Sequence, residues 1–83
     1  MSVSTTDLAR WKYDRASDVL YIAIRQVVPT YEVEHPACEG LHLRYSVDSD
    51  ELVGAIIVYF SKQDRGKLSR LLPFGFDLTS IAL

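Results

Sequence analysis

The sequence predicts a small α+β domain, built as an antiparallel meander sheet of about five strands with one C-terminal helix on one face. Three observations favour this class. Residues 41–47 alternate between apolar and polar side chains, residues 19–24 and 52–60 are apolar runs, and residues 62–72 show helical spacing. The connections between these segments are short, so consecutive strands are expected to be antiparallel.

The first two strands are predicted around a polar turn. Trp11 and Tyr13 flank Lys12, which is typical of a short strand. Residues 14–18 contain two aspartates and a serine, whose side chains bond readily to nearby backbone groups in turns. Residues 19–24 are apolar throughout and rich in β-branched side chains, which predicts a strand buried on both faces.

Three further strands follow. Residues 31–35 alternate two glutamates with larger side chains, and Pro36 ends this strand because proline cannot donate to a ladder. Residues 41–47 give the clearest period of two, and residues 48–50 form the next turn. Residues 52–60 are an apolar strand. Because the second and fifth strands are apolar on both sides, we expect both to be central in the sheet.

A single helix is predicted near the C-terminus. Ser61 is the expected N-cap, with Asp64 three residues further on as a weaker capping-box partner. The apolar face consists of Leu68, Leu71 and Leu72. Gly66 lowers the helix propensity, so the helix either spans residues 62–72 or begins only after Gly66, and Pro73 ends it.

The length of 83 residues allows one domain, with residues 1–10 as a flexible N-terminus, residues 11–83 as the domain and residues 73–83 as an apolar tail. Apolar residues make up 48% of the chain, which exceeds what a thin core can bury and predicts a homodimer. The alternative is a tail that folds back and seals a monomer. The residues expected at a subunit interface are Tyr21, Tyr59, Phe74, Phe76, Leu78 and Ile81.

Charge and cysteine content exclude several classes of protein. The net charge is -2, so the chain lacks the basic surplus that nucleic acids and anionic membranes require. No run approaches the roughly 18–20 apolar residues of a membrane helix. Cys38 is the only cysteine, so no intrachain disulfide forms and a reducing cytoplasm is the expected location. We therefore predict no nucleic-acid partner, no membrane partner and no cofactor.

One segment carries side chains capable of chemistry. His35, Cys38 and His42 lie within eight residues, a set that would hold Zn²⁺ or supply a thiol nucleophile with its base. Their spacing fits no common zinc motif, and the favoured interpretation is a structural connection with one buried cysteine. We predict no catalytic residue and no metal. Glu32 and Glu34 share one strand face, and the basic residues of the helix form another charged face; both patterns are typical of solvated surfaces.

Several segments together resemble the DUF2283 family of small bacterial domains. They are Tyr13-Asp-x-x-x-Asp-Val-Leu-Tyr-Ile22, Tyr31-Glu-Val33, Gly40-Leu-His-Leu43 and Leu52-Val-Gly-Ala-Ile-Ile57 with the helix after it. The resemblance covers about residues 12–72. It implies a small sheet with one helix, no established enzyme activity, and an antitoxin-type or accessory role. The chain departs from the family pattern at residues 44–46, where Arg-Tyr-Ser replaces an acidic run, and at residues 54–57.

Two functional hypotheses follow from the sequence. The first is a non-enzymatic homodimeric protein-interaction module that binds itself and, in an antitoxin-like role, a small toxin-like protein. The second is a small enzyme or ligand-binding protein with a site in the dimer crevice, for which His35, Cys38 and His42 are the candidate residues. A pocket with converging polar groups would favour the second hypothesis, and an exposed apolar face would favour the first.

Overall fold

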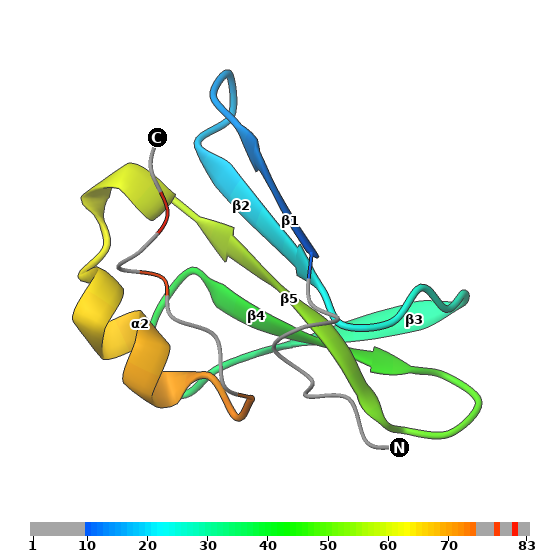
Figure 1. The fold of residues 1–83 in the computed structure, drawn as a ribbon. Coiled ribbons are helices and arrows are strands. Elements are labelled where there is room, and N and C mark those ends of the chain that lie inside the picture. The colour runs from blue at the N-terminus through cyan, green and yellow to red at the C-terminus, as the bar shows by residue number, and fades with distance from the viewer. Residues whose placement is uncertain (1–9, 75–77, 79–80, 82–83) are drawn as a thin grey trace, which may run out of the picture.

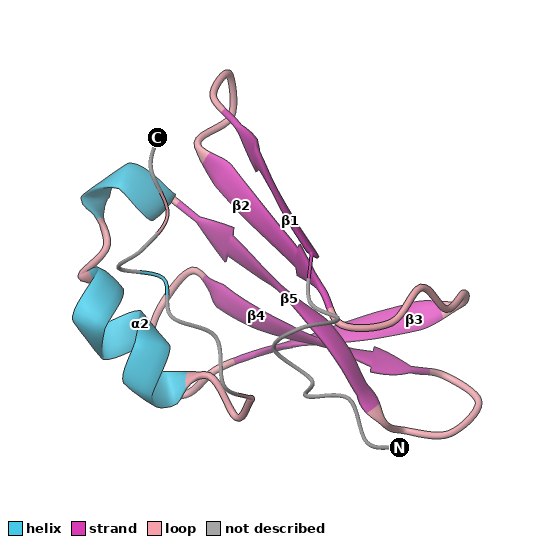
Figure 2. Cartoon of the chain, viewed as in Figure 1, coloured by secondary structure: helices cyan, strands magenta, loops and turns pink. Residues whose placement is uncertain are grey.

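The computed structural model describes residues 10–74, 78 and 81, which form one sheet with a helical segment against it (Figure 1). Figure 2 shows the strands in magenta and the helical turns in cyan. In chain order the elements are β1 (Arg10–Asp14), β2 (Val19–Ala23), β3 (Thr30–Glu34), β4 (Leu41–Ser46), β5 (Leu52–Val58), the 3-10 turn η1 (Phe60–Lys62) and α2 (Arg65–Leu71).

The predicted α+β class is confirmed: five antiparallel strands form one open sheet, followed by a C-terminal helix. The strand order, which the sequence left open, is β1-β2-β5-β4-β3. Strands β3, β4 and β5 form a meander, whereas β2 pairs with β5 instead of β3. This order places β5 at the centre and β2 beside it, so both apolar strands are flanked on each side, as their two-sided patterns predicted.

One face of the sheet packs against α2 and forms the core. Residues that pair directly across antiparallel strands share a face. Across β2, β5 and β4 the core face carries Leu20, Ile57 and Leu41 in one row, and Ile22, Ala55 and Leu43 in the next. Leu68 and Leu72 from the helical segment belong to the same buried cluster. Burial of such side chains supplies the main stabilisation, at about 1.5–3 kcal/mol each.

The end of β5 and the start of the helix differ from the prediction. The strand ends at Val58, two residues early, because Tyr59 adopts a left-handed backbone conformation with φ of 54°. The helix begins at Arg65, so neither predicted start is correct. Its N-cap is Asp64, whose carboxylate accepts the Lys67 amide at 3.1 Å, and not Ser61. The two-turn helix tolerates Gly66 in its first turn, where the propensity cost of about 1 kcal/mol is offset by this cap.

The two ends of the chain are described only in part. Arg10, predicted as flexible, is the first residue of β1; residues 1–9 of the predicted flexible N-terminus lie outside the described residues. In the tail, Leu78 and Ile81 are buried in the core, and Phe74 packs against it partly buried. The Leu78 amide donates to Ser69 Oγ at 3.0 Å, which ties this part of the tail to α2. Within the described ranges, no helix is long and apolar enough to cross a membrane.

Candidate interaction surface

The face of the sheet opposite α2 is the candidate functional surface, and we call it the open face. The strand register arranges its side chains in two rows that cross all five strands. The first row is Lys12, Tyr21, Ile56, His42 and Glu34. The second row is Arg10, Ala23, Gly54, Arg44 and Glu32. Among the described elements, the helical segment lies on the other side of the sheet (Figure 1).

The centre of the open face is apolar and only partly covered. Val19 and Val58 pair with each other and are half-buried, as is Ile56. Tyr21, directly beside Ile56, keeps 40% of its surface exposed. Half-buried apolar side chains in a contiguous patch are typical of surfaces that meet another protein.

The two edges of the open face carry opposite charge. Arg10 and Lys12 lie on the β1 edge, and Glu32 and Glu34 lie on the β3 edge. Four strand spacings separate these edges, about 19 Å at about 4.8 Å per spacing, so the charges do not pair within one chain. Asp14, at the end of β1, accepts the Ala16 amide at 3.1 Å, and Glu34 accepts the Gly40 amide at 3.3 Å. The face is therefore a dipolar surface, basic on one edge and acidic on the other.

The residues predicted at an interface fall into two groups. Tyr21 lies on the open face, and Tyr59 lies at the end of β5 with 62% of its surface exposed. By contrast, Leu78 and Ile81 are buried within the chain's own core. The positions of Leu78 and Ile81 agree with the alternative expectation, in which the tail folds back onto its own chain. Their side chains are not accessible to a partner in this fold. Phe74 is partly buried against the same core, and Phe76 lies outside the described residues.

The three candidate metal or catalytic residues are not brought together. Cys38 belongs to the buried core cluster, where its thiol contacts Gln63 Oε1 at 3.7 Å. His42 projects from the open face, in register with Ile56 and Glu34. The Nδ1 atom of His35 accepts the Ala37 amide at 3.0 Å and so closes a local turn. In the part of the chain that the structure describes, no group of three or more His, Cys, Asp or Glu residues is placed to hold a metal ion.

A polar network fixes the turn between β1 and β2 to the segment after β5. One Asp18 oxygen accepts the Tyr13 hydroxyl at 2.6 Å and the Ser61 amide at 2.9 Å, and the other accepts the Ser61 hydroxyl at 2.7 Å. The bond from Tyr13, followed by those from Ser61, lowers the pKa of Asp18. The bond to Asp18 raises the pKa of Tyr13. At neutral pH the pair is therefore a carboxylate and a protonated phenol, which suits a structural lock better than nucleophilic chemistry.

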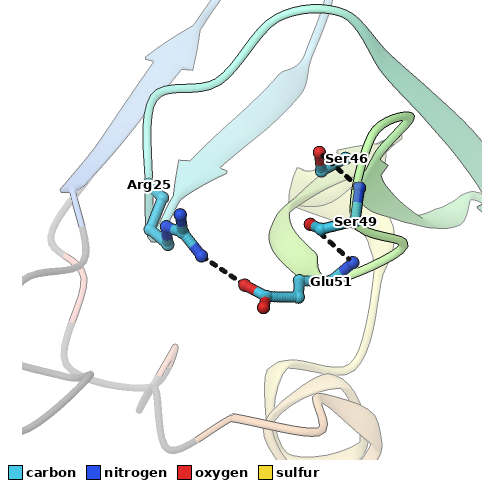
Figure 3. A network of polar contacts seen from close by, with 4 residues as sticks. All are labelled: Arg25, Ser46, Ser49 and Glu51. Carbon is cyan, nitrogen blue, oxygen red and sulfur yellow. Dashed lines mark hydrogen bonds and ion pairs between the residues drawn. The ribbon is translucent and has the colours of Figure 1, made fainter.

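The opposite end of the sheet is held by the β4–β5 hairpin. Figure 3 shows the Glu51 carboxylate paired with Arg25, which follows β2, while the Ser49 amide donates to Ser46 Oγ at 3.3 Å. The Glu51 amide donates to Ser49 Oγ at 3.4 Å. Both charged side chains are more than half exposed, so the ion pair orients the loop after β2 but adds little stability.

One charged residue of the helix has a role that sequence reasoning missed. Arg65 was predicted on the solvated basic face. Instead its guanidinium lies 5.0 Å from the centre of the Phe60 ring and donates to the Ile81 carbonyl at 2.6 Å. It therefore joins the tail to the core. The contact depends on the return of the tail, which no local pattern in the sequence shows.

Comparison with models of known protein families, with curated proteins and with solved structures finds no match. The resemblance to DUF2283 therefore stays a prediction. The open face, with its apolar centre and its charged edges, is the feature of the described residues that bears most directly on function.

Proposed function

We propose that this chain is a non-enzymatic homodimeric interaction module, a DUF2283-like domain, in which the open faces of two copies pack against each other. The observation that carries this proposal is the segregation of charge. Arg10 and Lys12 lie on one edge of the open face, Glu32 and Glu34 lie on the other, and apolar side chains lie between them. Such a surface is complementary to itself.

The charges select one symmetry for the dimer. A two-fold axis that runs parallel to β5, between the two sheets, lays the β1 edge of one copy over the β3 edge of the other. Lys12 then faces Glu34 of the second copy, Tyr21 faces His42, and the two Ile56 side chains meet at the axis. A two-fold axis across the strands would instead place Lys12 over Lys12. Two aligned sheets with a small rotation between them are an ordinary form of sheet packing.

The size of the open face predicts a dimer of modest affinity. Five strands span about 24 Å and five residues of strand about 17 Å, so each copy contributes roughly 400 Å² of flat area. The two copies together contribute about 800 Å² of flat area, and the relief of the side chains raises the area that is buried. The buried area therefore lies at the low end of specific interfaces, which begin near 1,000 Å². Since buried area alone does not set affinity, the charged edges and Tyr21 are expected to decide it. We expect a dissociation constant in the micromolar range.

Sedimentation velocity over a range of protein concentrations tests the proposal. The wild-type chain should shift from monomer to dimer as its concentration rises. Tyr21→Glu places a charge at the centre of the open face and should leave a folded monomer at every concentration. Val47→Glu is the matched control, because Val47 is equally an exposed apolar residue but lies in the hairpin beyond β4. A wild-type monomer throughout, or a Tyr21→Glu variant that still dimerises, would contradict the proposal.

A further inference from the structure

We propose that the end of the open face next to the loop after β2 holds a binding site for a small oxyanion, a phosphate or carboxylate group. A cavity of about 460 Å³ lies at this end of the face. Its lining consists of Ala23, Arg25, Gln26, Val27, Val28 and Arg44. The inference goes beyond the proposed dimer, because all of these residues come from one chain.

A glycine lies between the two residues of the sheet that line the cavity. Ala23 and Arg44 both pair with Gly54 on the central strand. A Cβ atom at Gly54 would lie 2.4 Å from the Ile22 carbonyl oxygen, so the close approach of β2 and β5 requires glycine here. Gly54 therefore projects no side chain between Ala23 and Arg44.

Arg44 makes no ion pair among the residues that the structure describes. Its Nε atom is buried without a hydrogen-bond partner there, and one terminal nitrogen donates to Thr30 Oγ1 at 3.1 Å. Glu32 lies opposite Arg44 in the register, yet the ion pair found in the described chain joins Arg25 to Glu51. A buried donor without a partner is costly. The Nε–H group is enclosed by the protein, but the guanidinium lines the cavity, and its terminal N–H groups can bond two oxygens of one carboxylate or phosphate.

A second arginine raises the positive electrostatic potential of the cavity. Arg25 lines the same cavity, and Arg10 lines an adjoining one that shares Ala23, Arg25 and Gln26 with it. The ion pair of Arg25 with Glu51 is exposed on both sides, so it holds the guanidinium only weakly and leaves most of its donors free for a ligand. Two arginines that converge on one cavity favour an anion over a neutral ligand.

NMR titration of the full chain tests the site. Inorganic phosphate, and in a separate arm acetate, is added at constant ionic strength while the Nε–Hε signal of Arg44 and the backbone amides of residues 26–28 are followed. We expect a saturable shift, and the anion that binds more tightly identifies the ligand as phosphate or carboxylate. Ala23 and Arg44 lie on the open face, which the proposed dimer would cover, so the titration is repeated in the Tyr21→Glu variant. Binding is read at Arg44 and dimerisation by sedimentation, so the two proposals fail separately. No saturable shift with either anion would overturn the site.

Three variants sharpen the test. Arg44→Gln should weaken binding at least about tenfold, equivalent to about 1.4 kcal/mol. Arg25→Gln, at an exposed position that does not threaten folding, should weaken it at least about threefold. Arg70→Gln removes the same charge from the helix, and it should change affinity less than twofold. An equal loss in Arg70→Gln would reveal non-specific attraction and overturn the site.

Discussion

Two glycine-to-alanine substitutions should change stability in opposite directions. Gly54 lies on the central strand β5, where an added Cβ would meet the backbone oxygen of Ile22 at 2.4 Å. Gly66 lies in the first turn of α2, where an added Cβ would meet only side-chain atoms, Asp64 Oδ1 at 3.3 Å and Arg70 Nη1 at 3.7 Å. The same chemical change therefore forces a shift of backbone in one place and meets only movable side-chain atoms in the other.

The expected magnitudes follow from these contacts. At Gly54 the clash costs about 1–3 kcal/mol, by analogy with overpacked cores. The lower entropy of the unfolded alanine chain offsets about 0.4–1 kcal/mol of this. The difference is about 0–2.6 kcal/mol. Because the atom met is a backbone oxygen that cannot rotate away, the upper part of this range applies, and Gly54→Ala should lower the free energy of unfolding by about 1–2 kcal/mol. Gly66→Ala should raise it by up to about 1 kcal/mol, the difference in helix propensity, less a small amount for the tight contact with the capping carboxylate.

Thermal unfolding followed by circular dichroism measures both effects. For a domain of this size, 1 kcal/mol moves the melting temperature by about 4–8 °C. Gly54→Ala should melt roughly 4–16 °C below the wild-type chain, and Gly66→Ala should melt a few degrees above it. A Gly54→Ala variant as stable as wild type would refute the close approach of β2 and β5.

Two further predictions concern the turn lock and the tail. Asp18→Asn keeps a residue that tolerates the φ of 58° but removes the carboxylate, so the pKa of Tyr13 should fall toward its ordinary value in a spectrophotometric titration. Because the folded-state pKa of Asp18 is lowered, its stabilisation is present above the unfolded pKa and is lost as the pH falls through the folded value. Wild type should exceed Asp18→Asn in melting temperature at neutral pH and lose this advantage in acid; a constant difference would count against the lock. Leu78→Ala should lower the free energy of unfolding in urea by about 2–5 kcal/mol, since Leu78 is fully buried, and a change below 1 kcal/mol would show that the tail is not part of the core.

Local patterns predicted the strands well because each carries its own periodicity. The alternation at residues 41–47 and the two apolar runs place β4, β2 and β5 within two residues of their bounds. The start of the helix was missed because Ser61 has a partner that no local pattern reveals. Its hydroxyl and amide bond Asp18, which lies 43 residues away in the sequence. Asp64 was therefore left to cap the helix.

The candidate surface was only partly predictable. Tyr21 was expected at an interface from its residue type and its place in a two-sided strand. The opposite charge of the two edges became visible only when β2 paired with β5, because this pairing sends β1 and β3 to opposite edges of one face. Likewise, the sequence shows Arg44 only as one of the polar residues that alternate with apolar ones in residues 41–47. Its place in one cavity with Arg25 depends on the loop after β2, which the alternation of β4 does not show.

A charge exchange across the open face tests the central claim most directly. Lys12→Glu should weaken dimerisation at least about tenfold in sedimentation velocity. Each of two symmetry-related contacts loses an attraction of about 0.5 kcal/mol and gains a repulsion of similar size, about 2 kcal/mol in all. The double variant Lys12→Glu/Glu34→Lys should restore the wild-type dissociation constant. Within one chain these residues lie about 19 Å apart, so restoration requires contact between copies. Lys12→Glu that dimerises like wild type, or a double variant as weak as the single, would contradict the face-to-face dimer.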